Sequence, residues 1–200
     1  MSAVEITAEI EKWGARAAQT LEEADLMIDF LRDKNVQVYL EIGARHGWTF
    51  YLVAKTLKPR WMIAVDLPGK LPWGDTDSEK VLERVVQRIR ADGIHTQIFY
   101  GDSIDPTLVA QLANTLCGEK VDMLFIDGDH KYAGVKSDWL NYSPFVRDGG
   151  YVIFHDVKPP HKIEPEKVIE VGKLWDELAP AHEHWLFHVK GGMGVGILKK

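Results

Sequence analysis

The sequence has 200 residues, 46% of them hydrophobic, and a formal net charge of −6, which fits one domain with a sizeable core and argues against nucleic acid as a general partner. Its acidic N-terminal stretch is unlike a signal peptide, and no apolar run approaches the roughly 20 residues that span a bilayer. The single cysteine, Cys117, excludes an intrachain disulfide, so we expect a soluble protein of the reducing cytoplasm.

The first third of the chain is predicted to combine helices with two strands. The elements, in order, are a helix through Ile6, Ile10, Trp13 and Ala17, a helix that opens at a capping box of Thr20 and Glu23, a strand over 36–42, a helix over 48–57 that ends before Pro59, and a strand over 61–66. A loop rich in glycine, proline and tryptophan follows, in which Trp73 is a candidate pocket residue.

The rest of the chain continues this alternation. The elements are a helix that opens at a second capping box of Thr76 and Glu79 and ends at Gly93, a strand over 96–102, a helix with Asp105 as N-cap and Pro106 at its first position, a strand over 121–127, a helix through Val135 and Trp139, a strand over 151–156, a helix over 168–178, and short strands over 184–189 and 194–200. The proline-containing loop at 158–166 is a candidate lid or substrate selector.

Strands that alternate with helices predict an α/β fold. The strands are continuous apolar runs, as expected when helices cover both faces of a sheet. We therefore predict a doubly wound, mostly parallel, seven-stranded sheet with an antiparallel C-terminal hairpin. One domain is expected over 1–200, with a helical extension at 1–33 that covers the site or mediates a homo-oligomer, and a core at 36–200. Ligands of such sheets bind beyond the carboxyl ends of the strands, so the polar residues there are candidate site residues.

Three successive strand ends carry features of a nucleoside site. The first ends in "EIGARHG", whose Gly43 and Gly47 permit a tight turn and close approach of a ligand, although the spacing is not the G-x-G-x-x-G of dinucleotide sites. The second ends in Asp66, a carboxylate that can accept hydrogen bonds from ribose hydroxyls, and the third brings Asp102 and Ser103 to an adenine edge. Each feature alone also fits an ordinary turn or helix cap, but together they favour a nucleoside-type cofactor.

Two further strand ends, "LFIDGDH" and "YVIFHD", carry acids and histidines. Asp127 ends one strand, and His155 and Asp156 end the next after one helical crossover, so these ends are expected to be neighbours. Carboxylates there favour a hard cation such as Mg²⁺ or Mn²⁺, and His130 is placed to act as a general base. Asp129 is a spare carboxylate that also fits a helix cap. The plain alternative is that all these residues are caps or surface groups.

The strand-end features resemble the class I S-adenosylmethionine-dependent methyltransferases over residues 36–200. The shared features are the E-x-G-x-x-x-G turn, the acidic end of the second strand and the antiparallel closing strands. The resemblance implies a Rossmann-like methyltransferase fold that binds S-adenosylmethionine. The implied cofactor contacts are Glu41 supporting the loop, Gly43, Gly47 and Thr49 at the methionine part, Asp66 at the ribose, Asp102 and Ser103 at adenine, and Asp127 at the amino group.

The stretch 125–156 also resembles the metal-dependent O-methyltransferases, which include catechol-type and macrolide-sugar enzymes, and a family labelled cephalosporin hydroxylases. The resemblance implies that Asp127, His155 and Asp156 are metal ligands and that His130 is the base. In these families the position that corresponds to His155, the first of the two polar residues at the end of the strand, is usually acidic. His155 in its place either shifts the metal preference from Mg²⁺ towards Mn²⁺, Fe²⁺ or Zn²⁺ or is not a ligand.

The leading hypothesis is a metal-assisted O-methyltransferase that acts on a hydroxyl of a small molecule, such as a sugar or a catechol-like diol. A second hypothesis is a non-haem iron oxygenase, with His130, His155 and one aspartate as ligands. A third is a cofactor-binding subunit without catalytic activity. The missing G-x-G-x-x-G disfavours a dinucleotide dehydrogenase.

Overall fold

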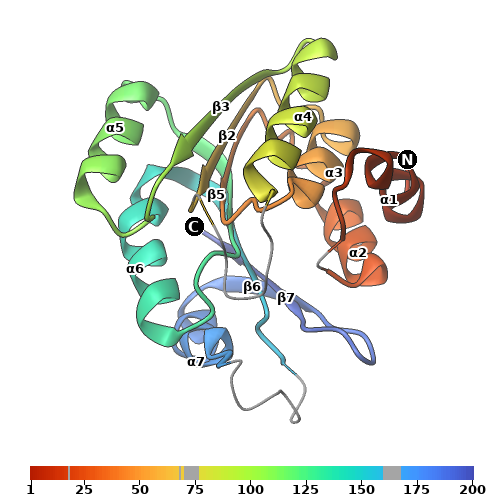
Figure 1. Ribbon diagram of the computed structural model, residues 1–200. Coiled ribbons are helices and arrows are strands. Elements are labelled where there is room, and N and C mark those ends of the chain that lie inside the picture. The colour runs from red at the N-terminus through yellow and green to blue at the C-terminus, as the bar shows by residue number, and fades with distance from the viewer. Residues whose placement is uncertain (18, 68, 70–76, 160–167) are drawn as a thin grey trace.

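A computed structural model of the protein describes residues 1–17, 19–67, 69, 77–159 and 168–200 (Figure 1). Within this part, the strands form one seven-stranded sheet in the order β3-β2-β1-β4-β5-β7-β6. The strands are β1 (Val38–Ile42), β2 (Trp61–Asp66), β3 (His95–Tyr100), β4 (Val121–Ile126), β5 (Val146–His155), β6 (Glu183–Phe187) and β7 (Val195–Lys199). The first five are parallel, while β7 runs antiparallel to β5 and β6. The predicted fold class is confirmed.

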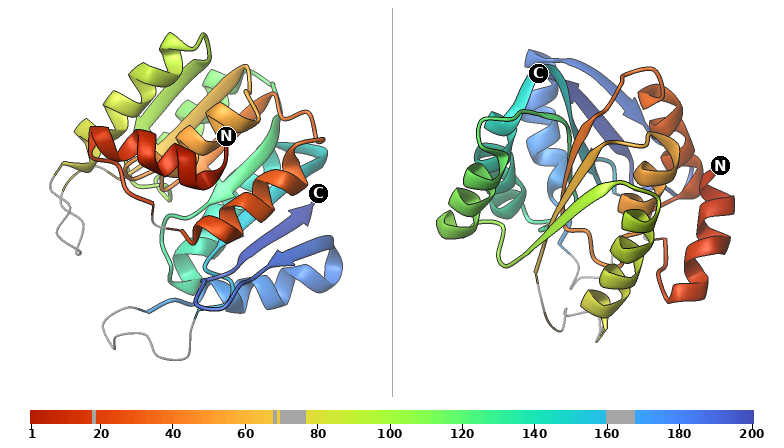
Figure 2. Two further views of the ribbon diagram at one scale, coloured as in Figure 1. Left: turned by 90° about the vertical axis from the view of Figure 1, so that its right-hand side faces the viewer. Right: turned by 90° about the horizontal axis from the view of Figure 1, so that it is seen from above.

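Helices cover both faces of the sheet, as the right-hand view of Figure 2 shows. One face carries α1 (Ala3–Ile10), α2 (Leu21–Leu31), α3 (Trp48–Thr56) and α4 (Ser78–Ala91). The other carries α5 (Pro106–Leu116), α6 (Tyr132–Tyr142) and α7 (Val171–Leu178). Every residue of β1 and β2 is therefore buried. Along β1, Tyr39 packs into the first core while Val38 and Leu40 pack into the second, as the two-residue period of a strand requires.

The N-terminal helices belong to the first of these cores. Ile6 and Ile10 of α1 and Met27 of α2 are fully buried against residues of α3 and α4. Figure 2 also shows α2 beside the C-terminal hairpin of β6 and β7, with which it is in contact. The first 31 residues thus complete the cover of one sheet face and join it to the end of the chain.

Two local expectations at the N-terminus were wrong. The first helix ends at Ile10 and continues only as a short 3₁₀ turn, because Gly14 adopts a left-handed φ of 88° well before Ala17. Thr20 is the N-cap of α2, but its side chain makes no capping hydrogen bond, and Glu23 contacts the C-terminal hairpin instead. The local capping pattern therefore predicted the start of α2 correctly, but it did not predict the partner of the Glu23 carboxylate.

Elsewhere the predicted elements are present, and most of their boundaries lie within two residues of those in the structure. Asp105 caps α5 by accepting the Thr107 N–H at 2.8 Å, and Gly93 follows the end of α4 with a left-handed φ of 84°. β5 begins at Val146, earlier than predicted, while α7 begins later than predicted, at Val171. Asp77 is the N-cap of α4 and makes no side-chain capping bond, whereas Thr76 lies outside the described residues. None of the described helices is long and apolar enough to cross a membrane.

Candidate functional site

The carboxyl ends of β1, β2, β4 and β5 meet at one edge of the sheet. Ile42 pairs with Val65 on one side and with Ile126 on the other, and Ile126 pairs with Phe154. The residues that follow these positions therefore lie side by side, as expected for parallel strands. This register brings the glycine turn, Asp66, Asp127 and the His155–Asp156 pair to the same edge.

Both glycines of the first turn are required by the backbone and by packing. Gly43 has a φ of +88°, and a side chain there would collide with the backbone carbonyl of Asp127. Gly47 has a φ of +75°, and its Cβ would lie 2.9 Å from a methyl group of Leu82. The turn is consequently in direct contact with the β4 end, so the proposed cofactor loop and the Asp127 site adjoin each other.

Two buried carboxylates lie at the ends of the strands next to this turn, and one of them bonds the turn directly. Asp66 is 7% exposed and accepts the backbone N–H of Arg45 at 2.9 Å, and its burial raises its pKa to about 6. Glu41 is 2% exposed and accepts the hydroxyl proton of Tyr39 at 2.5 Å, while burial raises its pKa to about 8. Asp66 fixes the turn with one oxygen and can accept further hydrogen bonds from a ligand.

The remaining predicted cofactor residues lie around the same edge. Thr49 is buried at the start of α3 and accepts a hydrogen bond from the side chain of Gln19 at 3.0 Å. Asp102 is exposed and accepts the Ile104 N–H at 3.1 Å, and the Ser103 carbonyl accepts the Tyr142 hydroxyl at 2.7 Å. Their contacts with a cofactor stay predictions.

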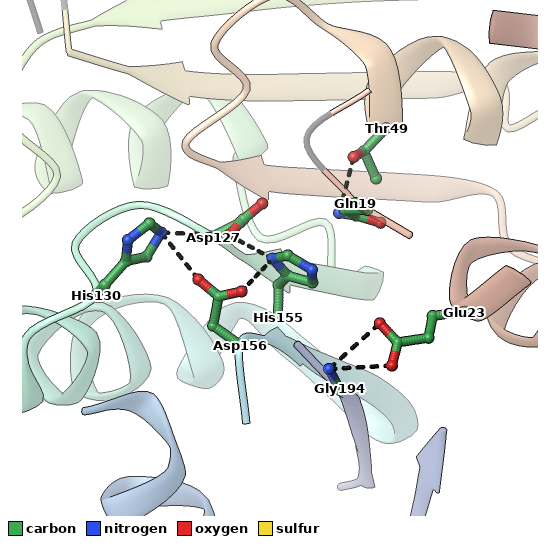
Figure 3. Close-up of polar contacts among 8 residues, drawn as sticks. All are labelled: Gln19, Glu23, Thr49, Asp127, His130, His155, Asp156 and Gly194. Atoms are coloured by element: carbon green, nitrogen blue, oxygen red, sulfur yellow. Dashed lines mark hydrogen bonds and ion pairs between the residues drawn. The ribbon is translucent and has the colours of Figure 1, made fainter. Parts of the chain in front are cut away.

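Asp127, His130 and Asp156 form the acidic centre of the edge. One potential ligand atom from each lies within 4.8 Å of the others (Figure 3). The Nε2 atom of His130 is 3.7 Å from Asp127 Oδ1 and 3.4 Å from Asp156 Oδ2. Two carboxylates and an imidazole at this spacing fit a divalent cation such as Mn²⁺ or Fe²⁺.

A second imidazole, that of His155, flanks the same carboxylates from the buried side. Its Nδ1 hydrogen-bonds to Asp127 Oδ1 at 3.2 Å and lies 2.9 Å from Asp156 Oδ1. Its Nε2 is buried and has no hydrogen-bond partner among the described residues. The side chain of His155 is 4% exposed, against 30% for His130, so the two histidines occupy different environments. Whether His155 is a metal ligand stays a prediction.

Charge pairing dominates the ionisation of this cluster. Burial alone would raise the pKa of Asp127, but the two histidines outweigh it and hold that pKa at about 2. Burial alone would lower the pKa of His155, but Asp127 and Asp156 outweigh the effect of burial and raise this pKa to about 10. The pKa of His130 is raised for the same reason. The two imidazoles thus favour the ionised form of Asp127, which is the form that can bind a cation.

Asp129 does not join the cluster. Its Oδ1 accepts the backbone N–H of Lys131 at 3.0 Å, but Lys131 is itself the N-cap of α6 and no side chain caps that helix, so the expected helix cap is wrong and Asp129 closes a turn before the helix. Most of the loop expected to form a lid lies outside the described residues, as does Trp73.

The burial of several polar residues was not anticipated from the sequence, among them Gln19, Glu23 and Asp138. Glu23 and Asp138 were detectable in principle, because each shares a helical stripe with buried apolar residues, Glu23 with Met27 and Leu31 and Asp138 with Val135 and Tyr142. Burial raises the pKa of Asp138 to about 7. Neither of its carboxylate oxygens has a hydrogen-bond partner in the part of the chain that the structure describes.

A family model described as a methyltransferase domain matches residues 40–157. An uncharacterized protein of Acanthamoeba polyphaga mimivirus is 28% identical over 160 residues, which span 80% of this chain and 69% of that protein.

Solved structures of O-methyltransferases share the fold. TomG from Streptomyces achromogenes, solved with S-adenosylmethionine, matches 99% of this chain and 89% of its own, with a TM-score of 0.66 and 13% identity. An enzyme from Bacillus cereus, solved with S-adenosylhomocysteine, matches 99% of this chain and 90% of its own, with a TM-score of 0.65 and 14% identity. At these identities the likeness establishes the Rossmann-like methyltransferase fold.

Proposed function

We propose, because this chain belongs to the methyltransferase-domain family, that it transfers a methyl group from S-adenosylmethionine to a hydroxyl of a small molecule with the help of a divalent cation. The observation that carries the proposal is the convergence of Asp127, His130 and Asp156 within 4.8 Å, directly beside the glycine turn. The fold shared with O-methyltransferases solved with this cofactor or its product supports it.

The glycine turn and Asp66 suit the cofactor. The Asp66 carboxylate is buried at the end of β2 and faces the turn through its bond to Arg45. Acceptance of ribose hydroxyls by this carboxylate, with Asp102 and Ser103 at the adenine, would orient the methionine end towards Gly43, Gly47 and Thr49. Glu41 precedes the turn by two residues on β1, where it accepts the hydroxyl proton of Tyr39.

Asp127 and Asp156 are the proposed ligands of the cation, and His155 orients Asp127 from the buried side or completes the ligand set. When bound, the cation supplies positive charge that holds two vicinal oxygens of the acceptor and lowers the pKa of one hydroxyl. If His155 completes the ligand set, its imidazole favours Mn²⁺ or Fe²⁺ over Mg²⁺.

His130 is the proposed base because it is the accessible histidine of the cluster. Its Nε2 takes the hydroxyl proton, and the oxygen forms a C–O bond with the methyl carbon while the C–S bond breaks. The electron pair of that bond stays on sulfur, so the sulfonium becomes the thioether of S-adenosylhomocysteine and the acceptor becomes a methyl ether. The chain contributes orientation and charge placement, and His130 returns its proton to solvent.

The charge of the cluster couples this base to the cation. Against the effect of burial, Asp127 and Asp156 raise the pKa of His130, which favours its protonated form. A cation that compensates the carboxylate charge would favour the neutral form of His130, which is the form that acts as a base. Methyl transfer should require a divalent cation even where cofactor binding does not.

Calorimetric titration tests the proposal. The chain should bind S-adenosylhomocysteine, and methyl transfer to a panel of catechols and sugar diols should be abolished by a chelator and restored by Mn²⁺. Absence of cofactor binding in this titration contradicts the proposal. Cofactor binding with no metal binding, and no effect of His130→Ala on the function of a partner enzyme, would instead indicate a non-catalytic subunit.

The donor set supports a second candidate, a non-haem iron oxygenase. The two imidazoles of His130 and His155 flank the same carboxylate, Asp127, and two histidines with one carboxylate are a frequent ligand set of Fe²⁺ oxygenases. This function predicts stoichiometric iron and oxygen consumption without S-adenosylmethionine. The family match and the turn beside Asp66 favour methyl transfer.

A further inference from the structure

Glu23 on α2 makes a long-range contact that the proposed reaction does not use. Its side chain is fully buried and accepts the backbone N–H of Val189 at 2.9 Å (Figure 3 shows its contact with Gly194). Both of its oxygens also lie near the N–H of Gly194, at 3.2 and 3.3 Å. A buried carboxylate is costly unless such donors satisfy it, so these bonds fix the position of the turn between β6 and β7 relative to α2.

The turn is shaped around this carboxylate. A side chain at Gly192 would collide with the carboxylate of Glu23. Gly194 has a φ of +82°, and its Cβ would lie 3.0 to 3.1 Å from atoms of Val157 and Lys158. The turn is therefore packed between α2 on one side and the segment that follows Asp156 on the other.

Hydrogen bonds connect the turn to that segment. The N–H of Lys158 donates to the Met193 carbonyl at 2.7 Å, and the N–H of Val157 donates to the Gly194 carbonyl at 3.3 Å. The residue before them, Asp156, has a left-handed φ of 62°, which is unfavourable for a residue other than glycine and must be held by its surroundings. The contacts thus run without a break from Glu23 through Gly194 and Val157 to the backbone of Asp156.

We propose that Glu23 is a positioning residue for the cation site: by fixing the β6–β7 turn, it holds the backbone of Asp156 so that its carboxylate converges with that of Asp127. This inference rests on the proposed function, in which Asp156 is a metal ligand. Removing the carboxylate of Glu23 should weaken cation binding and leave the cofactor side of the site unchanged.

The neighbouring Gln19 provides an internal contrast. It precedes α2 by two positions and donates to Thr49, which lies beside the glycine turn rather than beside Asp156. The same segment of chain therefore contacts both halves of the site through different residues. A general loosening of this segment would disturb both halves, whereas the role proposed for Glu23 affects the cation half alone.

The test measures binding of Mn²⁺ and of S-adenosylhomocysteine separately, with the full chain. Glu23→Gln keeps the size of the side chain but turns an amide group towards backbone donors, and Glu22→Gln, an exposed change on the same helix, is the matched control. Glu23→Gln should weaken Mn²⁺ binding roughly 10- to 100-fold, as loss of outer-sphere support for a ligand does elsewhere. S-adenosylhomocysteine binding should stay as in the control, and the amides of Val157 and Lys158 should exchange faster with deuterium.

A second variant, Gly192→Ala, changes the same contact from the side of the turn. It keeps the proposal testable if Glu23→Gln does not fold. Gly192→Ala should weaken Mn²⁺ binding in the native background, because its methyl group displaces the Glu23 carboxylate, and should add nothing in the Glu23→Ala background. Unchanged Mn²⁺ affinity in both single variants overturns the proposed role of Glu23 but not the proposed function. Equal loss of Mn²⁺ and S-adenosylhomocysteine binding also overturns it. Failure of the unaltered chain to bind Mn²⁺ overturns it together with the proposed cation.

Discussion

His155 hydrogen-bonds through Nδ1 to Asp127, so the last residue of β5 orients the carboxylate that follows β4. His130 reaches the same carboxylate from the open side of the edge. One histidine is held where solvent barely reaches it, and the other lies where an acceptor can approach. The two imidazoles should therefore respond differently to substitution.

Replacing His130 by Gln should lower the rate of methyl transfer roughly 10²- to 10⁴-fold, the usual contribution of a general base. Binding of S-adenosylhomocysteine should not change, because the residue does not contact the proposed ribose or methionine positions. Steady-state rates and calorimetry measure the two effects. If the rate of His130→Gln equals that of the unaltered chain, His130 is not the base.

Asp66→Ala should weaken S-adenosylhomocysteine binding by about 10- to 100-fold, since hydrogen bonds to a charged group contribute about 1.5–3 kcal/mol. Mn²⁺ binding should persist, because Asp66 lies at the end of β2 and outside the acidic cluster. Calorimetric titration of both ligands separates these outcomes. Loss of both would show that Asp66 acts through the fold of the turn rather than through the ribose.

Asp138 should make the protein less stable as pH rises. Burial raises its pKa in the folded state to about 7, so folding retains a proton that the unfolded chain releases near pH 4. The stabilising contribution is full below about pH 4 and is lost as pH rises through about 7, by up to roughly 4 kcal/mol.

The variant Asp138→Asn tests this directly, because an amide cannot ionise and neither oxygen of Asp138 has a hydrogen-bond partner among the described residues. Urea unfolding at pH 5 and pH 8 should show a smaller loss of stability in the variant than in the native chain. The exposed Asp148→Asn serves as control. Equal pH dependence in the variant and the native chain would contradict the prediction.

Gly43→Ala should destabilise the fold by about 2–4 kcal/mol, since a left-handed φ and a clash with backbone add together. Gly118→Ala is the matched control, because Gly118 has a similar φ of +87° but a Cβ added there would meet no described atom within 4 Å. The control should lose only about 1–2 kcal/mol. Urea unfolding of both variants measures the difference, and equal losses would show that the contact with Asp127 is not rigid.

Which residues meet at this edge of the sheet could be predicted from sequence, because parallel strands joined by single helices place their ends in a fixed order. That rule brought Asp127, His130 and Asp156 together from positions up to 29 residues apart. It could not give the different exposures of His130 and His155, because these depend on how each side chain packs, and their separate roles were implied only by the family resemblance. Nor could it find the partner of Glu23, since the capping-box pattern is local and the true contact lies 171 residues away.

That separation also bears on how the protein is made. During synthesis, the segment carrying Glu23 leaves the ribosome long before Gly194, and at about 5–20 residues per second the delay is roughly ten to thirty seconds. Until the final hairpin emerges, this carboxylate has no backbone donors from the turn and must remain hydrated. The contact between α2 and the β6–β7 turn can therefore close only after Gly194 has been synthesised, whereas the apolar contacts of α2 with α1 involve residues made at nearly the same time.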